Sequence, residues 1–80
     1  MDNRKDGKNY IRVIADMRPD LQIMPLKVIV DDKEYKVDSV IDIKRMVVPT
    51  LGERCFAYYC KFKTKLRILY LDAEFKWFTI

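Results

Sequence analysis

The fold of this chain is decided by the segment spanning residues 54–71, which reads RCFAYYCKFKTKLRILYL. In its first half the large apolar side chains occupy every second position, at Phe56, Tyr58, Cys60 and Phe62. A period of two is typical of a β-strand that turns one face to a core. The triplet Lys63-Thr64-Lys65 predicts a turn into a second strand over residues 66–71. We therefore expect a β-hairpin in this segment.

Further strands are expected on both sides of this hairpin. Runs of apolar residues, some alternating with polar residues and some continuous, predict strands over residues 10–17, 21–30, 34–44 and 75–80. Pro25 cannot donate a hydrogen bond to a neighbouring strand, so its strand is expected to be an edge there or to be bulged. The long run over 34–44 changes parity at Ser39 and Val40, which predicts a bend midway.

The segment over residues 10–17 fits two patterns. Its alternation predicts a strand, through Ile11, Val13, Ala15 and Met17. A helical stripe also fits, through Tyr10, Val13, Ile14 and Met17. The β-branched residues Ile11, Val13 and Ile14 favour the strand.

Six short strands separated by turns, with no convincing helix, indicate an all-β protein. The expected architecture is a small SH3-like or related partly open barrel of five to six antiparallel strands. A chain of 80 residues allows one domain, which we place at residues 10–80, and the polar residues 1–9 predict a flexible lead. Most of the core is expected from Ile11, Val13, Val28, Val30, Tyr35, Val37, Ile41, Ile43, Phe56, Tyr58, Cys60, Ile68 and Tyr70.

The composition excludes several classes of protein. Half of the residues are apolar, unlike a disordered chain, but no apolar run approaches the ~20 residues that span a bilayer. The polar N-terminus lacks the apolar stretch of a signal peptide, so we expect a cytoplasmic protein with no membrane partner. The chain has no histidine, no phosphate-cradling glycine loop and no nucleophile elbow. We therefore expect no enzyme, no cofactor and no metal site.

Cys55 and Cys60 are the only two cysteines of the chain. Their separation of five residues places them on opposite faces if they share one strand, so they could not form a disulfide there. Two thiols without a histidine are also too few for a structural zinc site. We expect both to be reduced and to fill the core, with Cys60 the less accessible.

The acidic residues favour structural roles. Asp31 and Asp32 are adjacent and lie in a predicted turn, without the alternating spacing of a calcium loop. Asp38 precedes the predicted bend, where its carboxylate could bond its own backbone or pair with Arg45 or Arg54.

The net charge of +4 is unevenly placed, because residues 54–67 carry five bases and no acid. Small barrels bind single-stranded nucleic acid by stacking bases on exposed aromatic rings beside basic side chains. The residues that match this pattern are Tyr59, Lys61, Lys63, Lys65 and Arg67. Lys61 and Lys63 should share a face with Tyr59, whereas the side taken by Lys65 and Arg67 depends on the turn register. The same composition also fits an ordinary solvated sheet.

Two other functions fit a small binding module. An open sheet edge, such as the one interrupted by Pro25, or a groove between loops could take a peptide of a partner protein. Alternatively, Val40, Leu69 and Leu71, which the expected alternation turns outward, could pair two copies into a homodimer. The expected partner is thus nucleic acid or another protein.

Several motifs occur together in a characteristic order: Ala15-Asp16-Met17-Arg18-Pro19-Asp20, Pro25-Leu26, Asp31-Asp32 followed by Tyr35-Lys36-Val37-Asp38-Ser39-Val40, then Asp42-Ile43-Lys44-Arg45 and Trp77-Phe78. In this the chain resembles a family of short uncharacterised proteins from Gram-positive bacteria, often associated with mobile genetic elements, over roughly residues 10–80. Where that family usually has a more glycine-rich loop, this chain has only Gly52. The resemblance implies a small β-fold in the bacterial cytoplasm and no particular ligand.

Overall fold

The computed structural model describes residues 8–20, 22–48 and 52–80, and within these ranges the chain is all-β. No helix there could cross a membrane. The described strands are β1 (Asn9–Tyr10), β2 (Arg12–Met17), β3 (Ile23–Val30), β4 (Lys33–Lys36), β5 (Ser39–Val47), β6 (Arg54–Phe62), β7 (Lys65–Asp72) and β8 (Trp77–Thr79).

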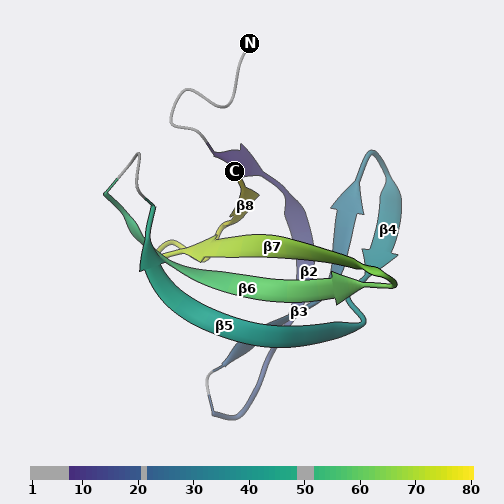
Figure 1. Ribbon diagram of the computed structural model, residues 1–80, viewed down its shortest axis with the longest axis horizontal. Coiled ribbons are helices and arrows are strands. Elements are labelled where there is room, and N and C mark those ends of the chain that lie inside the picture. The colour runs from purple at the N-terminus through teal and green to yellow at the C-terminus, as the bar shows by residue number, and fades with distance from the viewer. Residues whose placement is uncertain (1–7, 21, 49–51) are drawn as a thin grey trace.

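These strands form two antiparallel sheets that do not close into a barrel. The larger sheet has the order β1-β8-β7-β6-β5, and the smaller has the order β2-β3-β4. Figure 1 shows the strands of the smaller sheet running across those of the larger sheet, while the left ends of β5 and β6 extend past it in this view. The all-β, partly open fold is therefore confirmed.

The number of described strands exceeds the expected five to six for two reasons. Asn9 and Tyr10 form the separate strand β1, and the run expected over 34–44 is divided into β4 and β5 after Lys36. The domain also begins before residue 10, because Lys8 is buried. The rest of the expected lead, residues 1–7, lies outside the described residues.

The segment over residues 10–17 is a strand and not a helix. The predicted irregularity at Pro25 is also present. Ile14 pairs with Lys27 and Ala15 pairs with Pro25, so Leu26 is an extra residue in β3 and forms a bulge. The predicted bend near Val40 is confirmed by the break after Lys36 and by a second register shift, at Ile41.

Two tight turns set the register of the hairpins. Asp31 and Asp32 both have positive φ, 51° and 63°, and they join Val30 to its partner Lys33. Such left-handed pairs suit a two-residue hairpin, and aspartate tolerates this region better than most residues. Lys63 has a φ of 54° at the turn between β6 and β7. Its backbone N–H donates to the Asp38 carboxylate, so Asp38 anchors this turn and pairs with neither expected arginine.

The main core lies between the two sheets, on what we call the inner face of the larger sheet. Tyr58 illustrates the packing, because its ring contacts Trp77 at 4.9 Å between centroids and its hydroxyl donates to the Ile23 carbonyl at 2.7 Å. The buried members of this cluster are Val28, Val37, Tyr58, Cys60, Leu69, Leu71 and Trp77. A smaller cluster of Val48, Cys55 and Phe78, with Met46 and Tyr70 packed against it, covers part of the opposite, outer face.

The turn register reverses the expected orientation of β7. Phe62 pairs with Lys65 across a two-residue turn, so Tyr58 lies opposite Leu69 and both face the inner core. Leu69 and Leu71 are therefore buried, whereas Ile68 and Tyr70 lie on the outer face and are half-buried. The expectation that Leu69 and Leu71 point outward was wrong.

Four other residues expected in the core are exposed: Val30, Tyr35, Ile41 and Phe56. Ile41 is the extra residue of the β5 bulge, and Val30 lies at the tip of the β3–β4 hairpin. Phe56 does point to the inner face, but it is 40% exposed. It thus marks a part of the inner face that the smaller sheet leaves open.

Candidate functional site

The five residues expected to bind nucleic acid do not share one face. Tyr59 and Lys61 lie on the outer face, where they pair with Ile68 and Leu66 of β7. Lys65 and Arg67 pair with Phe62 and Cys60, so they belong to the inner face. Lys63 lies in the turn between them. The structure therefore brings together only Tyr59 and Lys61 of this set, with Lys63 at the tip.

A third basic residue joins Tyr59 from the neighbouring strand. The Lys44 ammonium lies 5.3 Å from the centroid of the Tyr59 ring, a distance typical of a cation–π contact. Asp42, the partner of Tyr59 in β5, forms a 4.0 Å ion pair with the same ammonium. Tyr59 itself is half-buried. Lys44 was missed in the sequence because it belongs to the neighbouring strand, outside the basic run over residues 54–67.

A different basic pair lies at the open end of the inner face. Arg45 pairs with Phe56, and Val47 pairs with Arg54, so these four side chains form a square on one side of β5 and β6. Phe56 and Val47 are 40% and 51% exposed, and both arginines are exposed. Two positive charges thus alternate with two exposed apolar side chains.

The surface beside this square is hollow. One hollow of about 480 Å³ is lined by both arginines, Val47, Phe56, Leu71 and Ala73 among others. A second, of about 300 Å³, extends from Phe56 and Leu71 to Ile23 and Phe75. The two share the lining residues Phe56, Leu71, Asp72 and Ala73, so they lie side by side. We call the two hollows together the arginine groove.

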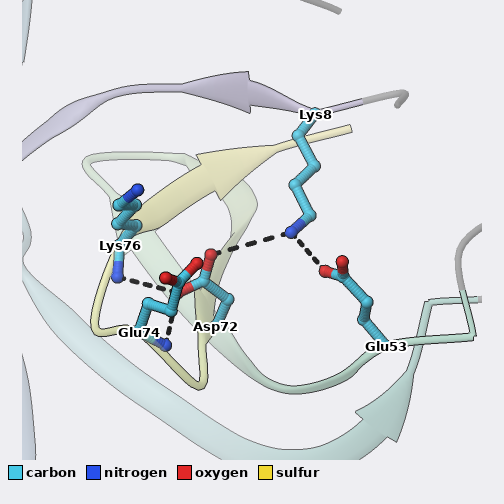
Figure 2. Close-up of polar contacts among 5 residues, drawn as sticks. All are labelled: Lys8, Glu53, Asp72, Glu74 and Lys76. Atoms are coloured by element: carbon cyan, nitrogen blue, oxygen red, sulfur yellow. Dashed lines mark hydrogen bonds and ion pairs between the residues drawn. The ribbon is translucent and has the colours of Figure 1, made fainter. Parts of the chain in front are cut away.

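The positive charge of the arginine groove is not neutralised by its neighbours. Within the part of the chain that the structure describes, Arg45 and Arg54 form no hydrogen bond or ion pair through their side chains. Asp72, the acid that lines the groove, and Glu53, which precedes Arg54 in the sequence, are both held by Lys8 (Figure 2). The groove therefore offers two free guanidinium groups.

Lys8 reaches its partners on the outer side of the sheet. Its ammonium is almost fully buried, hydrogen-bonded to Glu53 and 3.6 Å from the Asp72 carboxylate. It also lies 4.9 Å from the centroid of the Phe78 ring. The hydrogen bond that Lys8 donates to the Glu53 carboxylate is the main reason that the Lys8 pKa lies well above its ordinary value of 10.5, although burial opposes the rise. Lys8 is therefore a permanent cation at neutral pH.

Asp72 organises the turn that follows β7. Its Oδ1 accepts hydrogen bonds from the backbone N–H groups of Glu74 and Lys76, both at 2.9 Å, as Figure 2 shows. Its carbonyl accepts a third, from the N–H of Phe75 at 3.0 Å. Phe75 is held in the left-handed region, at a φ of 62°, and its ring is 69% exposed at the edge of the groove. A bulky residue in that region is strained, and the bonds from Asp72 hold it there.

The two cysteines lie on opposite faces of β6, as their spacing predicted, and both are free thiols. Cys60 is completely buried, and this desolvation raises its pKa to about 11. Burial also raises the pKa of Cys55, and the positive charge of Lys8 offsets part of this rise. Neither thiol is therefore a ready nucleophile at neutral pH. Among the described residues no three metal-ligating side chains lie together.

The arginine groove was not expected, although Arg45 and Arg54 had been considered as partners of Asp38. The signal in the sequence was the alternation of basic and apolar residues in Arg45-Met46-Val47 and in Arg54-Cys55-Phe56. That alternation becomes meaningful only when the two strands pair and when the smaller sheet stops short of them.

Comparison of the chain with protein-family models, with curated proteins and with solved structures finds no match. The resemblance to a family of short proteins of Gram-positive bacteria stays a prediction.

Proposed function

We propose that this chain is a small binding module that holds a segment of another protein in the arginine groove. The observation that carries the proposal is the pair of guanidinium groups of Arg45 and Arg54, which have no partner among the described residues and lie beside the exposed Phe56 over a hollow in the sheet. An exposed apolar depression flanked by charge is a common form of protein-interaction site.

The chemistry of the groove favours a partner with carboxylates next to apolar side chains. A guanidinium donates two parallel hydrogen bonds to one carboxylate, which orients the ligand as well as attracting it. An apolar side chain of the partner would displace water from the exposed Phe56 and Val47. Asp72 does not oppose such a ligand, because its carboxylate is turned to Lys8 and to two backbone N–H groups.

Selection from a library of random peptides of nine residues, displayed on phage, tests this proposal with the intact chain immobilised. The selected peptides should be rich in Asp or Glu close to a large apolar residue. Their binding should be lost in the variant Arg45→Gln/Arg54→Gln. It should be retained in Lys65→Gln/Arg67→Gln, which removes the same charge from the other end of the inner face. Equal binding by both variants would contradict the proposal.

The cluster around Tyr59 supports a second candidate, weak binding of single-stranded nucleic acid. Lys44 and Lys61 flank the Tyr59 ring on the outer face, and Lys63 lies at the adjacent turn. Three phosphate contacts would make the slope of log affinity against log salt about −2. Titration of the ¹⁵N-labelled protein with oligo(dT) at low salt should then shift the amide signals of these residues. If only the signals at the arginine groove shift, the cluster around Tyr59 is not the nucleic-acid site.

The homodimer expected through Val40, Leu69 and Leu71 is not proposed, because both leucines are buried in the core. We further propose that the chain acts in the bacterial cytoplasm without catalysing a reaction. Two unpaired, buried thiols fit a reducing compartment.

A further inference from the structure

The strand that borders the arginine groove has a free edge. β5 is the last strand of the larger sheet, and among the described strands it pairs only with β6. A free edge presents unpaired backbone N–H and C=O groups that can bind an extended segment as an additional strand. β5 is nine residues long, so its edge is an extensive one.

Only part of this edge is open. In an antiparallel pair, the backbone N–H and C=O groups of every second residue bond to the partner strand. The same groups of the residues between them point to the other side of the strand. The N–H of Val48 donates to the Glu53 carbonyl at 2.8 Å, across the continuation of the β5–β6 pair. The N–H of Ile43, of opposite parity, donates instead to the Asp42 carboxylate at 2.9 Å. Asp42 thus closes the edge at Ile43.

The same alternation turns the N–H groups of Arg45 and Val47 to the free side, where neither has a bond to another described residue. Val47 is 51% exposed. Beyond Ile43 the open part of the edge therefore consists of residues 45–47, and these are the β5 residues that line the larger hollow of the arginine groove. The unbonded backbone N–H groups of β5 and the two guanidinium groups therefore border the same groove.

We infer that the partner segment binds as an added β-strand along residues 45–47 of β5, and that it carries an acidic residue two positions from a large apolar residue. This inference rests on the proposed function and names its mode of binding. Alternate side chains of the added strand would face the same side as Arg45 and Val47. The residue beside Arg45 would be Asp or Glu, and the residue beside Val47 would be apolar and pack against the exposed Val47.

A second copy of this chain fits the edge less well than a different protein. A symmetric pair centred on Met46 would place Arg45 of each copy beside Val47 of the other. Four guanidinium groups would then lie on one face, where Asp72, the acid that lines the groove, is already held by Lys8. Like charges gathered at one interface oppose association. The charge of the groove therefore selects an acidic segment from another protein.

The first test uses a peptide obtained from the library described above, bound to the intact ¹⁵N-labelled chain. Saturation with this peptide should slow hydrogen exchange of the Arg45 and Val47 amides at least about tenfold, because both become bonded. The Ile43 amide, already bonded to Asp42, should change little. The selected sequences should also share an acidic and an apolar residue two positions apart.

The second test removes one backbone donor. Proline is tolerated on a strand edge where its nitrogen faces solvent, so Val47→Pro should fold and yet bind the peptide roughly tenfold more weakly. Val47→Thr keeps the N–H and a β-branched side chain, and it should bind within a factor of about three. The hydrogen-exchange result does not depend on whether the proline variant folds.

The outcomes separate this inference from the function on which it rests. If binding depends on Arg45 and Arg54 but the Arg45 and Val47 amides exchange as in the free protein, the peptide lies in the groove without adding a strand, and the inference is overturned. If the library yields no peptide that depends on the two arginines, the proposed function itself fails.

Discussion

Replacement of Lys8 by methionine is expected to be among the most destabilising single changes in this chain. Lys8→Met keeps an apolar stem of similar length but removes the charge. The ammonium lies between Glu53 and Asp72, and the side chains of Lys8 and Asp72 are only 4% and 5% exposed. The variant would therefore leave the Asp72 carboxylate buried without a counterion.

The expected size of this effect follows from the contacts that remain. Removal of one partner from a buried ion pair costs about 3–5 kcal/mol. Asp72 keeps its bonds from the N–H groups of Glu74 and Lys76, so we expect the lower end, about 3 kcal/mol. A domain of this length has roughly 4–12 kcal/mol of stability, and each kcal/mol shifts its midpoint by about 4–8 °C. The midpoint of Lys8→Met should thus fall by about 12–24 °C.

Thermal and urea unfolding followed by circular dichroism would measure this change. Glu53→Gln is the matched control, because Glu53 is 53% exposed and its pair with Lys8 should contribute no more than about 1 kcal/mol. The double variant Lys8→Met/Asp72→Asn removes both buried charges and keeps an acceptor for the two N–H groups, so it should recover most of the loss. A Lys8→Met variant within about 0.5 kcal/mol of the wild type, or no recovery in the double variant, would refute the reasoning.

The same contact predicts a dependence on alkaline pH. The Lys8 pKa is raised above 10.5 in the folded protein, so the folded state holds this proton more tightly than the unfolded state does. Its stabilisation is therefore complete below pH 10.5 and is lost as the pH rises through the folded-state pKa. The difference in stability between wild type and Lys8→Met should be constant from neutral pH to pH 10.5 and should shrink above it.

Three further predictions concern the core, a thiol and a turn. Phe78→Ala should lower the free energy of unfolding by about 3–5 kcal/mol, because Phe78 is completely buried. Phe56→Ala should lower it by only about 1–2 kcal/mol, because Phe56 is 40% exposed. Urea unfolding of both variants measures the two losses, and equal losses would contradict the difference in burial. The Cys60 thiol should react with a disulfide reagent at pH 8 only as fast as the protein unfolds, because burial raises its pKa to about 11. Labelling of Cys60 faster than labelling of Cys55 in the folded protein would contradict this prediction. Phe75→Gly should raise the stability by up to about 1 kcal/mol, since glycine adopts a φ of 62° without strain, and a lower thermal midpoint would argue against strain there.

The alternation of apolar residues predicted the strands well, because period two reports which residues share a face of one strand. It could not predict how two neighbouring strands align. A turn in which Phe62 opposed Leu66 would have placed Ile68 and Tyr70 in the core. The observed pair, Phe62 with Lys65, moves every side chain of β7 to the other face. The Asp38 carboxylate that holds Lys63 is 25 residues away in sequence, which no local pattern reveals.

The candidate site was harder to predict than the fold for the same physical reason. The basic run over residues 54–67 was visible in the sequence, but the turn register distributes Lys61 and Arg67 to opposite faces. The charge that does gather at one place comes from two strands, through Arg45 and Arg54. Its exposure depends on where the smaller sheet ends, which is a property of the packing of the whole chain.

The pairing of β1 with β8 has a consequence for the order in which the molecule assembles. Asn9 lies opposite Thr79, so this contact closes a loop of about seventy residues, and the entropy lost in closing a loop rises with its length. During synthesis the residues of β1 leave the ribosome long before their partner exists. We therefore expect the hairpins of β2–β3 and β6–β7 to form first, and β1 to dock last, with Lys8 inserted between Glu53 and Asp72 as the final step. Changes at Lys8 should then accelerate unfolding and leave the folding rate nearly unaltered.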